Sequence, residues 1–178
     1  MSDPVLILTG APGVGKTTVA RLLADRSPAG AHLESDRFFH FIRAGYVEPW
    51  RPESHAQNTA VMHAVGSCAT IYADSGYRTI IEGIISPRWF FAPLRDTLEG
   101  SGHAVAYAVL RAPLAVCMER AGSRAARPLA SARVVGQLWR EFAQLGALER
   151  HVLDAADRSA TEIAREIELR VAEGELSV

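Results

Sequence analysis

The feature that most constrains the fold is a glycine-rich loop, Gly10-Ala-Pro-Gly-Val-Gly-Lys-Thr17, between an apolar run and a helical pattern. Residues 4–8 before the loop are continuously apolar apart from the leading proline, as in a strand buried on both faces. From Thr17 to Asp25, apolar residues recur on one helical face. Such a loop turns backbone N–H groups inward, and the helix N-terminus adds positive charge. The sequence therefore predicts an anion-binding loop between a strand and a helix.

Lys16 lies in this loop and is the only lysine of the chain, although the chain has 19 basic residues. Its ammonium is a compact charge on a flexible stem, which suits it to the β- and γ-phosphates of a nucleotide and to catalysis there. The Thr17 hydroxyl is a typical oxygen ligand for Mg²⁺. The pattern G-x-x-x-x-G-K-[ST] in this context predicts a site for ATP and Mg²⁺. The alternative is a glycine turn that only caps a helix. The nucleotide-binding residues would be Gly10, Ala11, Pro12, Gly13, Val14, Gly15, Lys16, Thr17 and Thr18.

Apolar runs and helical patterns alternate along the rest of the chain. The alternation predicts an α/β fold, in which a five-stranded parallel sheet lies between two layers of helices, with residues 1–178 as one domain. Ser159 and Glu162 form a capping box for the last helix. Further strands are expected at 31–34, 78–83, 104–110 and 151–153, and further helices at 58–74, from Ser86-Pro87 onward, at 114–120, at 134–148 and from Ser159 onward.

Composition narrows the possible partners. The net charge of −1 gives no general attraction for nucleic acid or for an anionic membrane. The chain lacks the second lysine that a guanine-reading N-K-x-D motif needs, which excludes switch GTPases of that kind. Two widely spaced cysteines favour a reducing compartment. We therefore expect a cytoplasmic protein that binds a small molecule, as a monomer or a homodimer, and neither nucleic acid nor a membrane.

With its phosphate loop after the first strand, the sequence resembles the small P-loop kinases, a group that includes chloramphenicol phosphotransferase, gluconate kinase, shikimate kinase and adenylate kinase. It also resembles the AAA-type ATP-binding proteins of the zeta-toxin-like group. The resemblance implies the strand order 2-3-1-4-5, a substrate-facing acid after the second strand and an arginine-rich lid after the fourth. On this chain it places a substrate-binding segment at 37–75 and the lid at 118–133.

Asp36 follows the second predicted strand, Ala31–Glu34, and should lie at the carboxyl edge of the sheet, where open α/β folds bind ligands. In the kinases that the chain resembles, an aspartate here accepts the proton of the attacking hydroxyl, a role that suits a positioned carboxylate. The alternative is that Asp36 only caps a helix that starts at Arg37.

Glu82 ends the third predicted strand, which the resemblance places beside the strand of the phosphate loop. It is a candidate Mg²⁺ ligand together with Thr17, acting through water. Two alternatives remain open: Glu82 is the catalytic base while Asp36 orients the substrate, or it is a structural carboxylate. Adenylate kinase has Asp-Gly at this point, so the sequence departs from that pattern.

Arginines follow the fourth predicted strand at positions 120, 124 and 127, a spacing that places them on one helical face. The resemblance implies that Arg120 and Arg124 stabilise the transferred phosphoryl group and that Arg124 also contacts the nucleotide, with Arg127 and Arg133 as weaker candidates. The alternative is a solvated basic face. Arg158, after the last strand, would stack on the adenine ring or belong to an ordinary surface loop.

Aromatic residues crowd the substrate-binding segment between the second strand and the next helix. They would either line a pocket for a ring-bearing alcohol or form helix core, which we expect of at least half of them. The aromatic candidates are Phe38, Phe39, Phe41, Tyr46 and Trp50, and the polar anchors are Arg43, Arg51, His55 and Asn58.

These observations favour an ATP- and Mg²⁺-dependent kinase that phosphorylates a hydroxyl of a small molecule. A nucleotide kinase or a UDP-sugar kinase is an alternative within the same fold. A third hypothesis is a nucleotide-binding module that hydrolyses ATP slowly and acts through a partner. Asp36 separates the first from the third, because only a kinase needs a base that faces an acceptor pocket.

Overall fold

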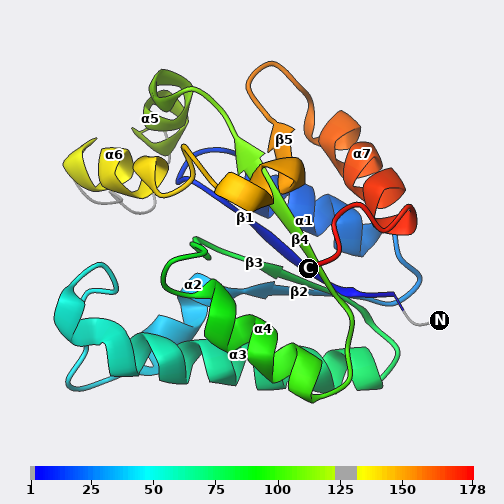
Figure 1. Cartoon of the computed structure of the whole chain (residues 1–178), viewed down its shortest axis with the longest axis horizontal. Helices are drawn as coiled ribbons and strands as arrows, with labels where there is room; N and C mark the ends of the chain where they lie inside the picture. The colour runs from blue at the N-terminus through cyan, green and yellow to red at the C-terminus, as the bar shows by residue number, and fades with distance from the viewer. Residues whose placement is uncertain (1–2, 123–131) are drawn as a thin grey trace.

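The computed structural model describes residues 3–122 and 132–178 and contains a five-stranded sheet (Figure 1). The strands lie in the order β2-β3-β1-β4-β5, and each neighbouring pair is parallel. This confirms the predicted fold class and strand order. The strands are β1 (Val5–Gly10), β2 (Gly30–Glu34), β3 (Arg78–Glu82), β4 (Val105–Arg111) and β5 (Val152–Asp154).

Helices cover both faces of the sheet. In Figure 1, α3 and α4 lie together below the sheet, α1 and α7 lie together on its other side, and α5 and α6 lie near its upper edge. In the described residues no helix has both the length and the apolar character needed to cross a membrane. The helices are α1 (Lys16–Asp25), α2 (Ser35–Phe38), α3 (His55–Asp74), α4 (Phe91–Gly100), α5 (Leu114–Gly122), α6 (Ala132–Arg140) and α7 (Ala160–Ala172), with short 3-10 helices η1 (Phe39–Phe41), η2 (Pro52–Ser54) and η3 (Gly146–His151).

The core lies along the two central strands. All six residues of β1 are buried, as are the first six of β4, because helices pack on both faces of a parallel sheet. Burial of these apolar side chains is the main favourable term in folding. The rigid central strands thereby fix the positions of the loops at their carboxyl ends.

Two predicted helices differ most from the structure in their bounds. The helix expected from Ser86-Pro87 begins at Phe91, because the Ser86 carbonyl accepts the N–H groups of residues 89, 90 and 91 in a turn. The helix expected over 134–148 spans Ala132–Arg140 and then breaks, so that the buried Phe142 can offer its carbonyl to Arg111 Nε at 2.9 Å. The capping box at Ser159 is confirmed, with Glu162 N donating to Ser159 Oγ at 3.3 Å and Ser159 N donating to Glu162 Oε2 at 2.9 Å.

Candidate active site

The glycine-rich loop joins β1 to α1, and three of its glycines have positive φ angles. A Cβ atom at Gly10 would lie 2.2 Å from the Leu110 carbonyl oxygen, and one at Gly13 would lie 2.2 Å from the Cys117 carbonyl oxygen. These two glycines therefore let the loop pack against β4 and α5. Gly15, at φ 107°, has nothing within 4 Å of the added Cβ position, so its side of the loop is open. The loop thus combines a tightly packed back with an open face at the N-terminus of α1, as an anion site requires.

Lys16 begins α1, and its side chain folds back over the loop. Its Nζ donates hydrogen bonds to the carbonyl oxygens of Gly10 at 2.9 Å and Ala11 at 3.0 Å. The side chain is buried, at 8% exposure. The ammonium is therefore held against the loop itself, beside the open face at Gly15.

Glu82 ends β3 and is buried beside the loop, at 5% exposure. The Thr17 hydroxyl hydrogen-bonds to its carboxyl group, whereas Oε2 has no hydrogen-bond partner among the described residues. Burial raises the pKa of this carboxyl group, and the positive charge of Lys16 opposes the rise. A buried carboxylate oxygen with unused acceptor capacity, next to a hydroxyl, is a donor set that fits a partly hydrated Mg²⁺. The residues present therefore fit the metal.

Gly83 brings the end of β3 close to the start of α2. A Cβ atom at Gly83 would lie 1.9 Å from Ser35 Oγ and 3.7 Å from Asp36 Oδ1. The negative charge of Asp36 contributes to the raised pKa of Glu82. The two candidate acids therefore lie on adjacent strand ends. Sequence reasoning did not single out Gly83, although a glycine directly after the acid of a buried strand is a signal of close backbone packing.

Asp36 lies in the first turn of α2, whose N-cap residue is Glu34, so the alternative that Asp36 only caps a helix starting at Arg37 is wrong. Glu34 is bound to its own helix, with Arg37 Nε at 2.9 Å from its carboxylate. Asp36 is exposed instead and lines a cavity of about 240 Å³. The carboxylate is thus placed where a bound molecule can reach it.

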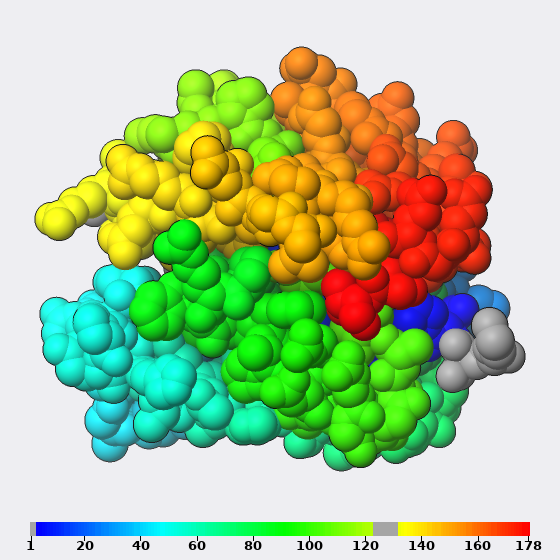
Figure 2. All heavy atoms as spheres, viewed as in Figure 1, coloured from blue at the N-terminus to red at the C-terminus, as the bar shows by residue number. Residues whose placement is uncertain are grey.

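The cavity lies among α2, η1, the segment 46–51, α3, the segment 84–90, and α6 with the residue after it. In Figure 2 the surface is hollowed between the α6 segment, in yellow, and the segment that follows β2, in cyan. Its lining is mostly apolar, and its aromatic residues are Phe39, Tyr46, Trp50, Trp89 and Phe90. Such a mostly apolar lining with a few polar groups is typical of a site for a small molecule.

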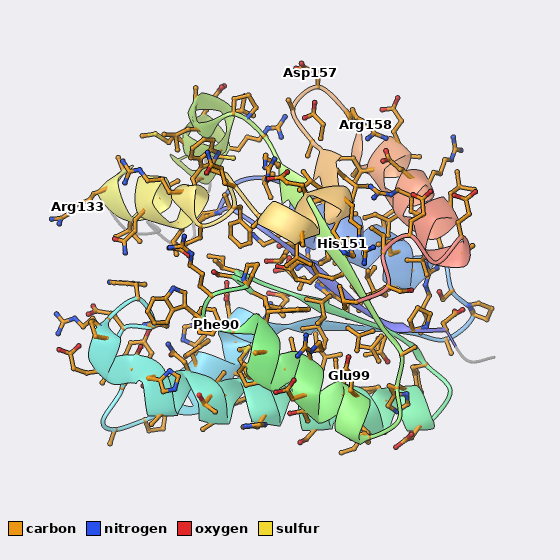
Figure 3. The ribbon with its side chains drawn as sticks, viewed as in Figure 1. Phe90, Glu99, Arg133, His151, Asp157 and Arg158 are labelled. Carbon is orange, nitrogen blue, oxygen red and sulfur yellow. The ribbon has the colours of Figure 1, made fainter. Side chains whose placement is uncertain are left out.

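The predicted aromatic cluster divides between pocket and packing, but fewer than half of its members pack with the core, which differs from the expectation. Phe39, Tyr46 and Trp50 line the cavity, whereas Phe38 packs against the core and meets the exposed Phe41 edge-to-face at 5.8 Å. Trp89 and Phe90 were missed, although they form an aromatic pair close after the third strand. Figure 3 shows Phe90 at the start of α4, on the side toward α6.

Of the four predicted polar anchors, one lines the cavity and the other three do not. Arg51 lines the cavity. Asn58 is buried and donates to the Pro49 carbonyl at 2.8 Å, so it holds the 42–51 segment in place. Arg43 and His55 are exposed and are not among the residues that line the cavity.

Arg120 lies on α5 and donates to the carbonyl oxygens of Ala155 at 3.2 Å and Ala156 at 2.8 Å. It therefore joins the helix after β4 to the segment after β5. Arg124 and Arg127, and most of the predicted lid, lie outside the described residues. Arg133 is exposed near the start of α6 and points away from the body of the protein (Figure 3).

Arg158 is engaged by α7. Its guanidinium is ion-paired with Glu166 and donates to the Glu162 carbonyl at 3.4 Å (Figure 3). These contacts orient the guanidinium toward α7, which favours the surface-loop alternative. Adenine stacking by Arg158 stays a prediction.

Comparisons with known proteins agree with this arrangement. No curated protein matches the sequence. The Deinococcus radiodurans tunicamycin resistance protein is 23% identical with a TM-score of 0.67, covering 95% of both chains. A gluconokinase from Sinorhizobium meliloti is 17% identical with a TM-score of 0.68, covering 97% of this chain and 94% of the other. The Mycobacterium tuberculosis APS kinase in complex with AMPPNP and APS is 20% identical with a TM-score of 0.70, covering 97% and 99%.

These likenesses confirm the resemblance to small P-loop kinases at the level of the fold, with its five-stranded parallel sheet in the order 2-3-1-4-5. A family model described as an AAA domain matches residues 5–148, which include the phosphate loop, Asp36, Glu82 and Arg120. By this match the chain belongs to the AAA domain family.

Proposed function

We propose that the protein is an ATP- and Mg²⁺-dependent kinase that transfers the γ-phosphoryl group of ATP to a hydroxyl of a small molecule. The observation that carries the proposal is the continuity of the site. The open face of the phosphate loop adjoins Glu82, Gly83 brings Glu82 close to Asp36, and Asp36 lines a cavity large enough for a small molecule. A module that only bound a nucleotide would not need an acid facing such a cavity.

The phosphate loop and Lys16 would bind the triphosphate. In the described arrangement the Lys16 ammonium donates to two carbonyl groups of its own loop. Phosphate oxygens are stronger acceptors than these carbonyls because they are charged. On nucleotide binding, the ammonium would exchange at least one carbonyl partner for phosphate oxygens while staying over the same loop.

Thr17 and Glu82 would hold Mg²⁺, with the carboxylate acting directly or through water. The metal, when bound, neutralises charge on the phosphate oxygens. The raised pKa of Glu82 means that the protein without metal keeps this carboxyl partly protonated to a higher pH than an exposed glutamate. Metal binding and loss of that proton are therefore coupled.

Asp36 would act as the general base. The acceptor oxygen forms a bond to the γ-phosphorus as its proton passes to the Asp36 carboxylate, and the bond between the γ-phosphorus and the β,γ-bridging oxygen breaks to release ADP. The substrate-binding segment 37–75 supplies Phe39, Tyr46 and Trp50 to the walls that orient the acceptor.

Arg120 would support the nucleotide from the same edge of the sheet as the phosphate loop. Its contacts with Ala155 and Ala156 fix the segment after β5 relative to α5. In this fold the carboxyl ends of β1 and β4 flank the phosphate loop, so the nucleoside would extend toward that segment. The segment after β5 and the lid at 118–133 would together surround the nucleotide in the proposed single catalytic domain.

The experiment that tests the function is ADP release at saturating ATP and Mg²⁺, with and without a panel of small alcohols. Sugars, sugar acids, nucleosides and aromatic alcohols would be compared. We expect at least one class to stimulate ADP release and to appear as a phosphorylated product by mass spectrometry. Slow hydrolysis that no alcohol stimulates would contradict the proposal and would favour a module that acts through a partner.

A further inference from the structure

The cavity beside Asp36 offers large aromatic faces to whatever it binds. Trp50 and Trp89 line it and are 43% and 51% exposed, respectively. Binding free energy at such exposed tryptophan faces is most favourable when a flat apolar group covers them, because burial of aromatic surface and ring packing both contribute. Met62 and Leu138 extend the apolar wall on α3 and α6. The geometry therefore favours a ligand with a ring over an open-chain polyol.

Charged groups of the described lining are arranged unfavourably for an anion. Neither of its basic side chains, His40 and Arg51, is buried. Arg51 is 61% exposed and ion-paired with Glu48 at 3.0 Å, so solvent and its partner both reduce its field. Burial raises the pKa of the lining residue Tyr46, and the charges of Glu48 and Asp36 add to the rise. Both charges that act on Tyr46 are therefore negative.

Glu141 adds a second carboxylate to the cavity, from the segment after α6. Its side chain is 20% exposed and accepts a hydrogen bond from Ser86 Oγ at 3.2 Å. Its ionic partner is Arg88, whose Nε lies 3.9 Å away and whose side chain is 75% exposed. A carboxylate accepts about four hydrogen bonds, so these contacts leave Glu141 with acceptor capacity. Asp36 and Glu141 reach the cavity from different elements.

We infer that the acceptor is a ring-bearing alcohol without negative charge, and that Glu141 determines specificity by binding a second donor, a hydroxyl or an amine. The inference rests on the proposed function, in which Asp36 takes the proton of the reacting hydroxyl. A substrate that carries a carboxylate, phosphate or sulfate would bring its charge close to these two acids, while the basic side chains of the described lining are exposed to solvent. A neutral or cationic substrate would meet an apolar wall for the ring and an acid for each polar end.

Three compounds of nearly equal size test the substrate class. Phenylethylene glycol, phenylethanolamine and mandelate share a phenyl ring and a benzylic hydroxyl. They differ at the next carbon, which carries a hydroxyl in the first, carries an amine in the second and is the carboxylate carbon in the third. Binding is measured by calorimetry on the full chain, and turnover by ADP release. We expect the glycol and the amine to bind at least about tenfold more tightly than mandelate. Each can donate a hydrogen bond to the Glu141 carboxylate, whereas the carboxylate of mandelate cannot. Equal or tighter binding of mandelate would overturn the inference.

Glu141→Gln tests the specificity role. Glutamine keeps the size and an oxygen that accepts from Ser86, but it loses the negative charge. The variant should bind phenylethanolamine about tenfold more weakly, bind the glycol within about threefold of the parent and gain affinity for mandelate. Glu99→Gln is the matched control, because Glu99 is exposed on α4 and is not among the residues that line the cavity (Figure 3). An unchanged ratio of amine to mandelate affinity in Glu141→Gln would overturn the role of Glu141.

The outcomes separate this inference from the proposed function. If the glycol and the amine bind but no alcohol stimulates ADP release, the kinase proposal fails and the assignment of the cavity stands. If neither binds while an anionic alcohol is phosphorylated, the kinase proposal stands and the inference is wrong.

Discussion

At the scale of single residues, the proposed role of each side chain depends on its burial and on the groups that contact it. Glu82 is a buried acid with an unpartnered oxygen among the described residues, which is costly unless a cation shares the site. Gly83 has no side chain because Ser35 occupies the space. Lys16, Asp36 and Glu82 could be predicted from the sequence because their motif or strand-end position indicates them. Gly83 carries only the local signal of a glycine after a strand-end acid, and Glu141 carries none, because tertiary packing brings their partners to them.

Glu82→Gln should separate metal binding from folding. Burial raises the pKa of Glu82, so the folded state holds this proton more tightly than the unfolded state does. The contribution of Glu82 to the free energy of unfolding is therefore lost as pH rises from about 4.5 toward the pKa of the folded state. A neutral glutamine removes this penalty. We expect unfolding temperatures at pH 7 that equal or exceed those of the parent, and a Mg²⁺ requirement for ADP release at least about tenfold higher. An unchanged Mg²⁺ titration would rule out Glu82 as a metal-binding residue.

Gly83→Ala should destabilise the site locally. The new Cβ would lie 1.9 Å from Ser35 Oγ and 3.2 Å from Ser35 Cβ, so the Ser35 hydroxyl must rotate away and the backbone must shift slightly, at a cost of about 1–3 kcal/mol. Ser35→Gly in the same chain should recover part of that loss in denaturant unfolding. Gly100→Ala is the control, because an added Cβ there meets nothing within 4 Å and alanine favours the helix. Equal stability of Gly83→Ala and Gly100→Ala would show that the close approach is absent.

At the scale of elements, strands and capped helices could be predicted better than connections. The five apolar runs became the five strands, and the Ser159 capping box opens α7. The helix expected over 134–148 was too long because helical periodicity does not register that Phe142 must leave the helix to reach the core. Trp89 and Phe90 could not be assigned to the cavity from the sequence, because no local pattern shows that the 84–90 turn faces it.

Ser159→Ala tests the cap of α7. The substitution removes the oxygen that accepts Glu162 N at 3.3 Å and should lower the free energy of unfolding by about 1 kcal/mol. Ser101→Ala is a suitable control, since the Ser101 hydroxyl only donates to the Thr97 carbonyl at the end of α4. If both substitutions have the same small effect, the capping box contributes nothing to stability.

At the scale of the whole molecule, the strand order gathers the proposed machinery at one edge of the sheet. The phosphate loop follows β1, Asp36 follows β2, Glu82 ends β3, and Arg120 contacts the residues that follow β5. Parallel strands end at the same edge, so residues distant in sequence become neighbours there. The parallel α/β class could be predicted from the alternation of elements, and the strand order from the resemblance to small P-loop kinases. The shape and charge of the cavity could not, because they depend on side chains from five separate segments.

A buried histidine should make the stability of the whole fold depend on pH. His151 is fully buried, and its Nδ1 lies 3.0 Å from the Tyr107 carbonyl oxygen. Burial lowers its pKa below 6.5, so its contribution is present above pH 6.5 and is lost as pH falls toward the folded value. His151→Asn should reduce stability at pH 7 but flatten its decline between pH 7 and pH 5. His32, whose pKa burial also lowers, will leave a residual slope.

Thermal unfolding across this pH range checks the prediction, with His55→Asn at an exposed position as the control. An undiminished slope in His151→Asn, equal to that of His55→Asn, would show that His151 is not the source.

The measurement that tests the central claim most directly is acceptor-dependent ADP release by Asp36→Asn, together with its affinity for ATP. Asparagine keeps the shape but cannot accept the proton of a hydroxyl. The account predicts an ATP dissociation constant within about threefold of the parent and a loss of about 10²–10⁴-fold in acceptor-dependent turnover. Unchanged turnover in a variant that binds ATP normally would contradict the assignment of Asp36 as the base that serves the cavity.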